Sequence, residues 1–244
     1  MKIWQKSLLA VLVTLAIGSL YLYSVWRDRR NPGKVVSQDP YQNLTPDDVA
    51  IVRVKWMTTF DDTLSLVGTS VWMKMGYVMP YYPFAGGRVE FQKSMGLIPA
   101  AQRLDVKKIV KAVAPASVDD GVSHGSRQVF AVFALPGNPA GNSELYATAI
   151  GAIDGDQEAY FCDNLFFYDD PHKIYDYWPH DVWTAIDTHQ VKPGMSELET
   201  RMSIGQMTQT DGGSKGNRVV TYDVNGKKWT VTFVDNHATA IQNQ

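Results

Sequence analysis

The chain has 244 residues, which is enough for one large domain or two modest ones with a sizeable core. Its 45% hydrophobic and 20% charged residues are ordinary for a folded protein, and its net charge of −2 argues against a nucleic-acid-binding protein, which carries a basic surplus. The single cysteine, Cys162, excludes an intrachain disulfide framework, a haem-attachment motif and a multi-cysteine zinc site.

The N-terminal stretch SLLAVLVTLAIGSLYLYSVW, residues 7–26, is uncharged and mostly apolar. A helix of about 20 such residues reaches about 30 Å, the thickness of the bilayer hydrocarbon. We therefore predict a transmembrane anchor in residues 1–30, with a cleaved signal peptide as the alternative; signal peptides have shorter apolar cores and small residues at the cleavage site. The residues expected to face lipid or its interface are Trp4, Leu8, Leu12, Leu15, Leu20, Tyr23 and Trp26.

The charges that flank residues 7–26 give conflicting signals about orientation. Lys2 and Lys6 precede the stretch, whereas Arg27, Arg29 and Arg30 follow it. The excess of positive charge after the stretch favours a cytoplasmic body, but such a short N-terminal tail is more usual in anchors that export the body. Both orientations stay open on these residues alone.

Residues 31–48 are polar and rich in proline, which predicts a linker before the first body, residues 49–178. Alternating residues predict a strand over 49–60. The spacing of Leu104, Ile109 and Val113 predicts a short amphipathic helix over 101–113.

Two further segments complete this body. Residues 127–135 have the composition of a strand, and residues 144–170 predict a hairpin that turns at DGDQ. The first body is therefore predicted to be mixed α and β, with an antiparallel sheet.

The segment WMKMGYVMPYYPF, residues 72–84, is rich in aromatic residues and methionine. Such residues are most often buried in a core, but its prolines argue against continuous regular structure, and exposed aromatic and methionine side chains suit a contact surface. The candidate partner-contact residues are Trp72, Met75, Tyr77, Met79, Tyr81, Tyr82 and Phe84.

Residues 179–244 predict a separate module of two helices followed by strands. A short helix fits residues 179–191, and Ser196 followed by Glu199 has the spacing of a capping box that begins a second helix. Gly205 suits the end of that helix. The dipeptide NG at 225–226, between two alternating runs, predicts a β-hairpin.

This order of elements resembles the SmpA/OmlA family, also called BamE-like, over about the last 60 residues of the chain. In that family a GM[ST] motif opens a short helix that closes in LG; here Gly194-Met195-Ser196 and Ile204-Gly205 take those places. The family's proline after the closing glycine and its lipidated cysteine are both missing here. The residues that carry the resemblance are Gly194, Met195, Ser196, Glu199, Gly205, Tyr222, Trp229 and Phe233. The resemblance implies an ααβββ protein-binding module in the bacterial envelope, and it favours export of the body.

Three places hold residue types that carry chemistry. Residues 168–181 contain the weak metal-ligand candidates Asp169, Asp170, His172 and His180, but their spacing matches no metal motif and a turn-rich loop is the simpler interpretation. Residues 119–126 hold neighbouring Asp, Ser and His, which seldom form a triad. Cys162 lies in an apolar strand, where cysteine is usually a small buried residue.

Together these features predict an α+β protein held by one helix in the bacterial inner membrane, with its soluble part in the periplasm and the cytoplasmic face as the alternative. We expect a non-catalytic scaffold or accessory subunit of a larger membrane protein complex, with the lipid bilayer and other proteins as partners and without nucleic acid or cofactor. A membrane-tethered metal-binding protein or hydrolase that uses residues 168–181 is the first alternative. A structural subunit of a photosynthetic or respiratory complex is the second.

Overall fold

The computed structural model describes residues 3–30, 44–77, 79–122, 127–136, 144–205, 207–224 and 226–243. The side chains of residues 3, 6–11, 13, 28–30 and 224 lie outside that description. The chain divides into two compact units, Met1–Asp48 and Val49–Gln244, so the predicted boundary at residue 178 lies inside the second unit.

The first unit contains the helix α1 (Ile3–Arg30), which includes the predicted anchor. Its described aromatic and aliphatic side chains are exposed apart from the half-buried Val25, and the rings of Tyr23 and Trp26 lie 6.0 Å apart. The short helix α2 (Pro46–Val49) begins after Thr45, whose hydroxyl donates to the Asp48 carboxylate at 2.7 Å.

The prediction of a transmembrane anchor is corrected by this structure. A membrane-spanning helix needs about 20 consecutive, predominantly apolar residues. Among the described residues, no helix combines the length and the apolar character that crossing a membrane requires. The predicted membrane helix, single-pass topology and bilayer partner are therefore not supported. The side chain of Leu8, one of the predicted anchor residues, lies outside the described set.

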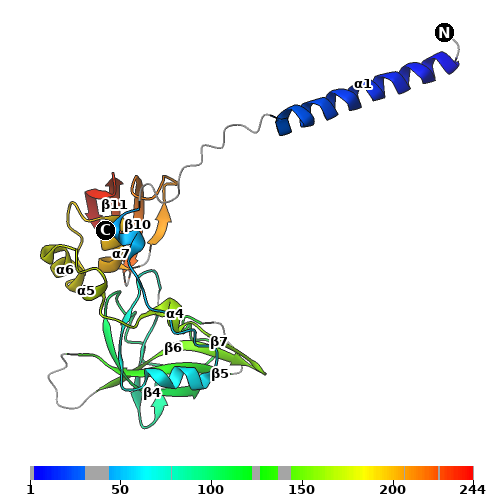
Figure 1. The fold of residues 1–244 in the computed structure, drawn as a ribbon. Coiled ribbons are helices and arrows are strands. Elements are labelled where there is room, and N and C mark those ends of the chain that lie inside the picture. The colour runs from blue at the N-terminus through cyan, green and yellow to red at the C-terminus, as the bar shows by residue number, and fades with distance from the viewer. Residues whose placement is uncertain are drawn as a thin grey trace. The chain divides into compact units, whose positions relative to one another are not determined.

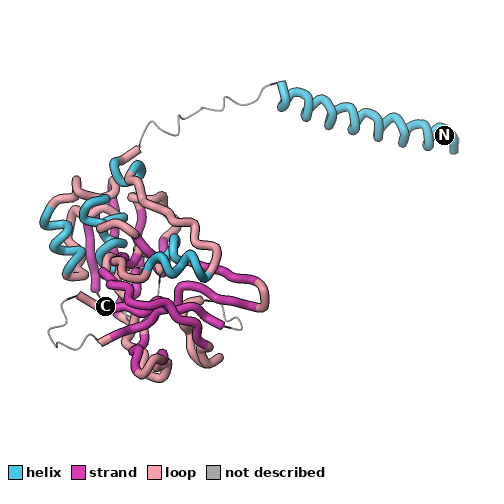
Figure 2. The backbone as a smooth tube through the Cα atoms, turned by 60° about the horizontal axis from the view of Figure 1, so that its bottom comes forward, coloured by secondary structure: helices cyan, strands magenta, loops and turns pink. Residues whose placement is uncertain are grey.

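The second unit is built mainly from two antiparallel sheets, and its strands dominate Figure 2. The larger sheet has eight strands in the order β3-β2-β6-β5-β4-β1-β8, with β7 paired to β6. Its strands are β1 (Ser70–Met73), β2 (Tyr82–Ala85), β3 (Arg88–Val89), β4 (Arg103–Ala112), β5 (Arg127–Ala134), β6 (Leu145–Asp154), β7 (Gln157–Tyr160) and β8 (Phe166–Phe167).

The predicted helix over residues 101–113 is wrong, because these residues form the strand β4 in the centre of the larger sheet. Leu104, Val106 and Ile109 are all buried, and the register shifts between Val106 and Lys108 where the strand carries a bulge. A bulge adds one residue to the two-residue alternation of a strand. The spacing of Leu104 and Ile109 therefore imitated the period of a helix.

The main core lies against the larger sheet, and its central strands β4, β5 and β6 lie together in Figure 1. Phe130 and Phe133 on β5 and Ile150 on β6 are fully buried in this core. The turn between β6 and β7 falls within DGDQ, so the predicted hairpin is confirmed. Short helical turns connect the strands: α3 (Phe60–Thr63), η1 (Leu64–Leu66) and α4 (Cys162–Leu165).

The strands β1 and β8 join the main core to a second apolar cluster. Met73 and Phe166 face the main core, whereas their neighbours Trp72 and Phe167 pack in the second cluster, because successive side chains of a strand point to opposite faces. Three helices contribute to the second cluster: α6 (His180–Asp187) supplies the largest share of its buried residues, α7 (Glu197–Ile204) adds Met202, and α5 (Pro171–Ile174) adds the partly buried Ile174.

The smaller sheet has the order β12-β11-β10-β9. Its strands are β9 (Met207–Thr210), β10 (Arg218–Val224), β11 (Lys227–Val234) and β12 (His237–Asn243). Val231 and Phe233 are buried with Trp229 packed beside them, which confirms that these three share a face. The hairpin at 225–226 is also confirmed by the pairing of Val224 with Lys227; Asn225 itself lies outside the described residues.

The C-terminal region therefore has two helices and four strands, and the predicted ααβββ order is corrected by the additional strand β9. This strand lies at a sheet edge and buries little, so no apolar alternation marks it in the sequence. The predicted fold class, α+β with a transmembrane helix, is also corrected. Most regular structure of the second unit is antiparallel sheet, and its described helices have at most 8 residues.

Candidate functional site

Residues 50–57 cross the surface of the second unit as an extended segment, which we call the strap. The strap was predicted as part of a strand, but it pairs with no strand in the described structure. Ala50 and Val52 pack on the helical cluster, and Met57 is buried in the main core. Ile51 and Trp56 point outward, with 90% and 78% of their surface exposed.

The carboxylate of Asp163 holds the end of the strap. Its Oδ1 accepts a hydrogen bond from the backbone amide of Lys55 at 2.8 Å, and its Oδ2 accepts one from the amide of Trp56 at 2.9 Å. The Tyr168 hydroxyl also donates to Oδ1 at 2.9 Å. Burial and this hydrogen bond both raise the pKa of Tyr168, so the tyrosine stays a neutral donor.

Trp56 adopts a φ of +54°, in the left-handed region of backbone conformation. A bulky residue there is an outlier, and such strain costs about 1–3 kcal/mol and persists only where the surroundings enforce it. Here the hydrogen bonds from the backbone amides of Lys55 and Trp56 to Asp163 enforce the positive φ. Trp56 projects into solvent, and Val54, two residues before it, is also 46% exposed, so the alternation expected of a strand does not hold in the strap.

The strap's basic residues have partners on the body. Arg53 forms an ion pair with Asp169 at 2.7 Å, and the Lys55 ammonium lies 4.9 Å from the centre of the Tyr168 ring. The pair of Arg53 and Asp169 is at the surface, where an ion pair contributes about 0–1 kcal/mol. These two contacts orient the strap. Asp169, one of the predicted metal-ligand candidates, therefore takes part in an ion pair with Arg53.

A second candidate site centres on His172, at the beginning of α5. Its Nδ1 lies 2.9 Å from Oδ1 of Asp170, and its Nε2 lies 3.4 Å from Oδ1 of Asp187. The imidazole stacks on the Trp183 ring with 3.9 Å between the ring centres. Two predicted residues, Asp170 and His172, therefore meet, and Asp187 joins them from the end of α6.

A cavity of about 240 Å³ opens beside His172, and its lining includes Trp72, Arg103 and His189. Ala101 and His189, which both line this cavity, have φ values of +59° and +53°. Residues held in this region often mark functional sites. A cavity of this size fits a small ligand, and its lining offers an imidazole, a carboxylate and a guanidinium as polar contacts.

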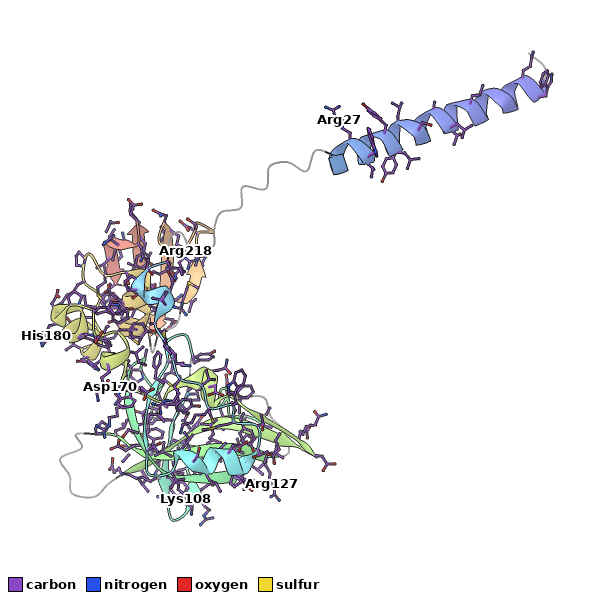
Figure 3. All side chains as sticks on the ribbon, in the orientation of Figure 1. Arg27, Lys108, Arg127, Asp170, His180 and Arg218 are labelled. Atoms are coloured by element: carbon purple, nitrogen blue, oxygen red, sulfur yellow. The ribbon has the colours of Figure 1, made fainter. Side chains whose placement is uncertain are left out.

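The remaining metal-ligand candidate, His180, does not join this group. His180 is the first residue of α6, and its Nδ1 lies 3.5 Å from the Thr184 hydroxyl. Figure 3 labels both His180 and Asp170, at separate places on the helical part of the second unit. Within the described ranges, no group of three or more histidine, cysteine, aspartate or glutamate side chains could hold a metal ion.

The predicted partner-contact residues of 72–84 have mixed surroundings. Met79 and Tyr82 are buried in or beside the main core, whereas Tyr77 is 40% exposed. The half-buried members are Trp72, Met75, Tyr81 and Phe84. Most of this segment therefore contributes to packing, and exposed aromatic surface lies instead on the strap.

The residues that carry the BamE-like resemblance form the framework of the C-terminal region. Ser196 and Glu199 make the predicted capping box, and Gly194 donates its amide to the Ala238 carbonyl at 2.9 Å. The other members occupy the core or its edge: Met195, Gly205, Tyr222, Trp229 and Phe233.

Glu197 on α7 is a buried carboxylate that the sequence analysis did not single out. Its carboxylate accepts hydrogen bonds from the Arg218 guanidinium on β10 and from the amide of Gly216 at 3.0 Å; Figure 3 labels Arg218 among the C-terminal strands. Burial raises the pKa of Glu197, but the bonds from Arg218 and Gly216 outweigh burial and lower it. This ion pair joins α7 to the smaller sheet.

The chain matches no protein-family model, no curated protein and no solved structure.

Proposed function

We propose that this chain is a non-catalytic scaffold or accessory subunit that binds another protein through the strap. The observation that carries this proposal is Trp56, an exposed indole held in a strained backbone conformation by Asp163. Tryptophan is among the residues that contribute most to protein interfaces, and a backbone that is already fixed at this position loses less entropy on binding.

The neighbouring side chains support a protein as the partner. Ile51, Val54 and Trp56 are all exposed, and Arg53 and Lys55 stand between them. Apolar anchors bordered by charged residues are the usual anatomy of an interface. The resemblance of residues 194–233 to the BamE-like family adds to this proposal, because that family consists of protein-binding modules.

Site-specific photocrosslinking in the full chain tests this function. A crosslinker at position 51 should capture one recurring protein at stoichiometric yield, and Trp56→Ala should reduce that yield at least tenfold without changing the unfolding midpoint. A crosslinker at Val234, which is 48% exposed on the smaller sheet, is the matched control. Equal capture from both positions, or capture unaffected by Trp56→Ala, would refute the proposal.

A second candidate function, acid–base catalysis, is favoured by the geometry at His172. The Asp170 carboxylate orients the imidazole through Nδ1, which is how an aspartate supports a catalytic histidine, and a cavity adjoins the ring. Among the described residues that line this cavity there is no serine or cysteine, so His172 would activate water.

Hydrolysis of model esters, phosphoesters and glycosides by the full chain tests this second function. Turnover that is lost in His172→Gln and kept in His180→Gln would support it. No turnover in the wild-type protein, or the same turnover in both variants, would exclude His172 as a base.

A further inference from the structure

A separate cavity of about 480 Å³ opens on one face of the larger sheet, where β2 lies between β3 and β6. We call it the β2–β6 cavity. Pro83 on β2 pairs with Tyr146 on β6. On its other side Pro83 faces Glu90, whose backbone amide donates to the Pro83 carbonyl at 2.9 Å and continues the register of β2 with β3. Directly opposite residues of antiparallel strands place their side chains on the same face, so all three line the cavity from one side of the sheet.

Glu144 reaches the same cavity from the position just before β6. It lies two residues before Tyr146, so the side chains of both residues share a face. Their contact confirms this direction, because the Tyr146 hydroxyl donates a hydrogen bond to Oε2 of Glu144 at 2.7 Å. This bond raises the pKa of Tyr146 to about 12, so the hydroxyl stays a neutral donor. The Glu144 carboxylate is therefore held at the wall of the cavity.

The charges of the cavity lining do not cancel. Among the described residues that line it, the charged ones are Glu90, Lys93 and Glu144. The Lys93 ammonium pairs with the Glu90 carboxylate at 3.1 Å. Glu144 forms no ion pair with any residue that the structure describes, and Arg88 on β3 does not line the cavity. One negative charge, that of Glu144, is thus left without a cation beside it.

The rest of the lining is mainly apolar. The Tyr146 ring is almost completely buried and contacts the Tyr81 ring in edge-on geometry, with 5.4 Å between the centres. Met95 is tied to the sheet by a hydrogen bond from its backbone amide to the Tyr81 carbonyl at 3.0 Å, while its flexible side chain is exposed. The apolar wall is formed by Pro83, Ala85, Met95 and Tyr146. Such a wall shelters an apolar group of a ligand from water.

From this combination we infer that the β2–β6 cavity binds an organic amine with an apolar body, its ammonium beside the Glu144 carboxylate and its apolar part along the wall. An ammonium donates charge-assisted hydrogen bonds to a carboxylate, which are stronger than bonds between neutral groups. The apolar wall supplies affinity in proportion to the area buried, at about 25 cal/mol per Å². An anionic ligand would instead be repelled by Glu144. This site is independent of the strap and of His172.

Calorimetric titration of the full chain with octylamine at neutral pH, where the amine is protonated, tests the inference. Octylammonium should bind at one site, octanol should bind about twofold to fivefold more weakly, and octanoate should bind more weakly than octanol. Raising the salt concentration should weaken octylammonium binding and leave octanol binding unchanged, since salt screens exposed charges.

Substitutions locate the site. Glu144→Gln should weaken octylammonium binding by about twofold to fivefold, the range for exposed ion pairs, and should leave octanol binding unchanged. Ala85→Phe places a ring at an exposed position that lines the cavity, so it should weaken the binding of both ligands.

Glu158→Gln is the matched control. Glu158 is also exposed and also accepts a hydrogen bond from the tyrosine two residues later, Tyr160, at 2.9 Å, but it does not line the cavity. An equal loss of octylammonium binding in Glu158→Gln, no loss in Glu144→Gln, or octanol binding as tightly as octylammonium would overturn the inference. Tighter binding of a lysine-containing apolar peptide at Glu144 would also overturn it, because the cavity would then be a protein-contact surface.

Discussion

The backbone amide of Trp56 donates a hydrogen bond to Oδ2 of Asp163 across 107 positions of the sequence, at 2.9 Å. This bond and its neighbour from the amide of Lys55 are the only contacts between a carboxylate and the strap backbone among the described residues. They hold the backbone of the strap against α4 at the residue that carries the exposed indole. The proposed protein-contact function therefore depends on a residue that does not itself touch the partner.

Asp163→Ala is expected to lower the free energy of unfolding by about 2 kcal/mol and to release the strap. The amides of Lys55 and Trp56 and the Tyr168 hydroxyl all lose their acceptor in this variant. Chemical denaturation gives the stability, and limited proteolysis within residues 50–57 reports release. Asp176→Ala, at an exposed aspartate on the body, is the control and should change neither.

Trp56→Gly is expected to be about 0.5–1 kcal/mol more stable than Trp56→Ala. Glycine adopts a positive φ without the steric penalty that alanine meets at +54°. Both variants should lose partner binding to the same extent, because both lack the indole. Equal stability of the two, measured by denaturant unfolding, would mean that the left-handed conformation of Trp56 is not maintained in solution.

Glu197→Gln is expected to destabilise the chain by about 3 kcal/mol, because it breaks the ion pair between the buried side chain at 197 and the partly buried Arg218 guanidinium. The folded-state pKa of Glu197 is lowered, so its contribution to stability is complete above the unfolded-state value of about 4.3 and is lost as the pH falls through the folded-state pKa.

Unfolding free energies measured between pH 2 and pH 7 check this prediction. The difference in unfolding free energy between wild type and variant should be constant above pH about 4.3 and should shrink as the pH falls below it. The control Glu90→Gln removes an exposed surface pair and should follow the wild-type curve. A difference between Glu197→Gln and wild type that stays constant down to the lowest pH would contradict the proposed charge pairing.

Cys162 is expected to be unreactive toward thiol reagents in the folded protein. Its side chain is fully buried, and burial raises the pKa of the thiol to about 12, so almost no thiolate is present at neutral pH. Modification measured by mass spectrometry should follow unfolding in denaturant. Rapid modification without denaturant would show that the segment around α4 opens locally.

Ser196→Ala is expected to cost about 1 kcal/mol through loss of the capping box at the start of α7. Because Thr59 and Asp62 form a second capping box at α3, Thr59→Ala offers an internal comparison. We expect the larger effect from Ser196→Ala, since α7 is buried and α3 is a single exposed turn; thermal unfolding compares them.

The local elements that the sequence predicted are those whose signals lie within a few residues. The capping box at Ser196 and Glu199, the hairpin at 225–226 and the turn at DGDQ each depend on hydrogen bonds between near neighbours. The strand β5 was also predicted correctly, because its continuous apolar run is buried on both faces.

Tertiary contacts decided the rest. The bulge in β4 gave a strand the apolar spacing of a helix, and the strap packs on the body without pairing with any strand in the described structure. The meeting of Asp170 and His172 with Asp187, the bonds from the strap to Asp163 and the pairing of Glu197 with Arg218 join residues that lie up to 108 positions apart. By itself, the sequence determined the local turns and caps, whereas packing of distant segments determined which side chains converge, because no short-range pattern encodes which distant partner satisfies a charge or hydrogen-bond donor.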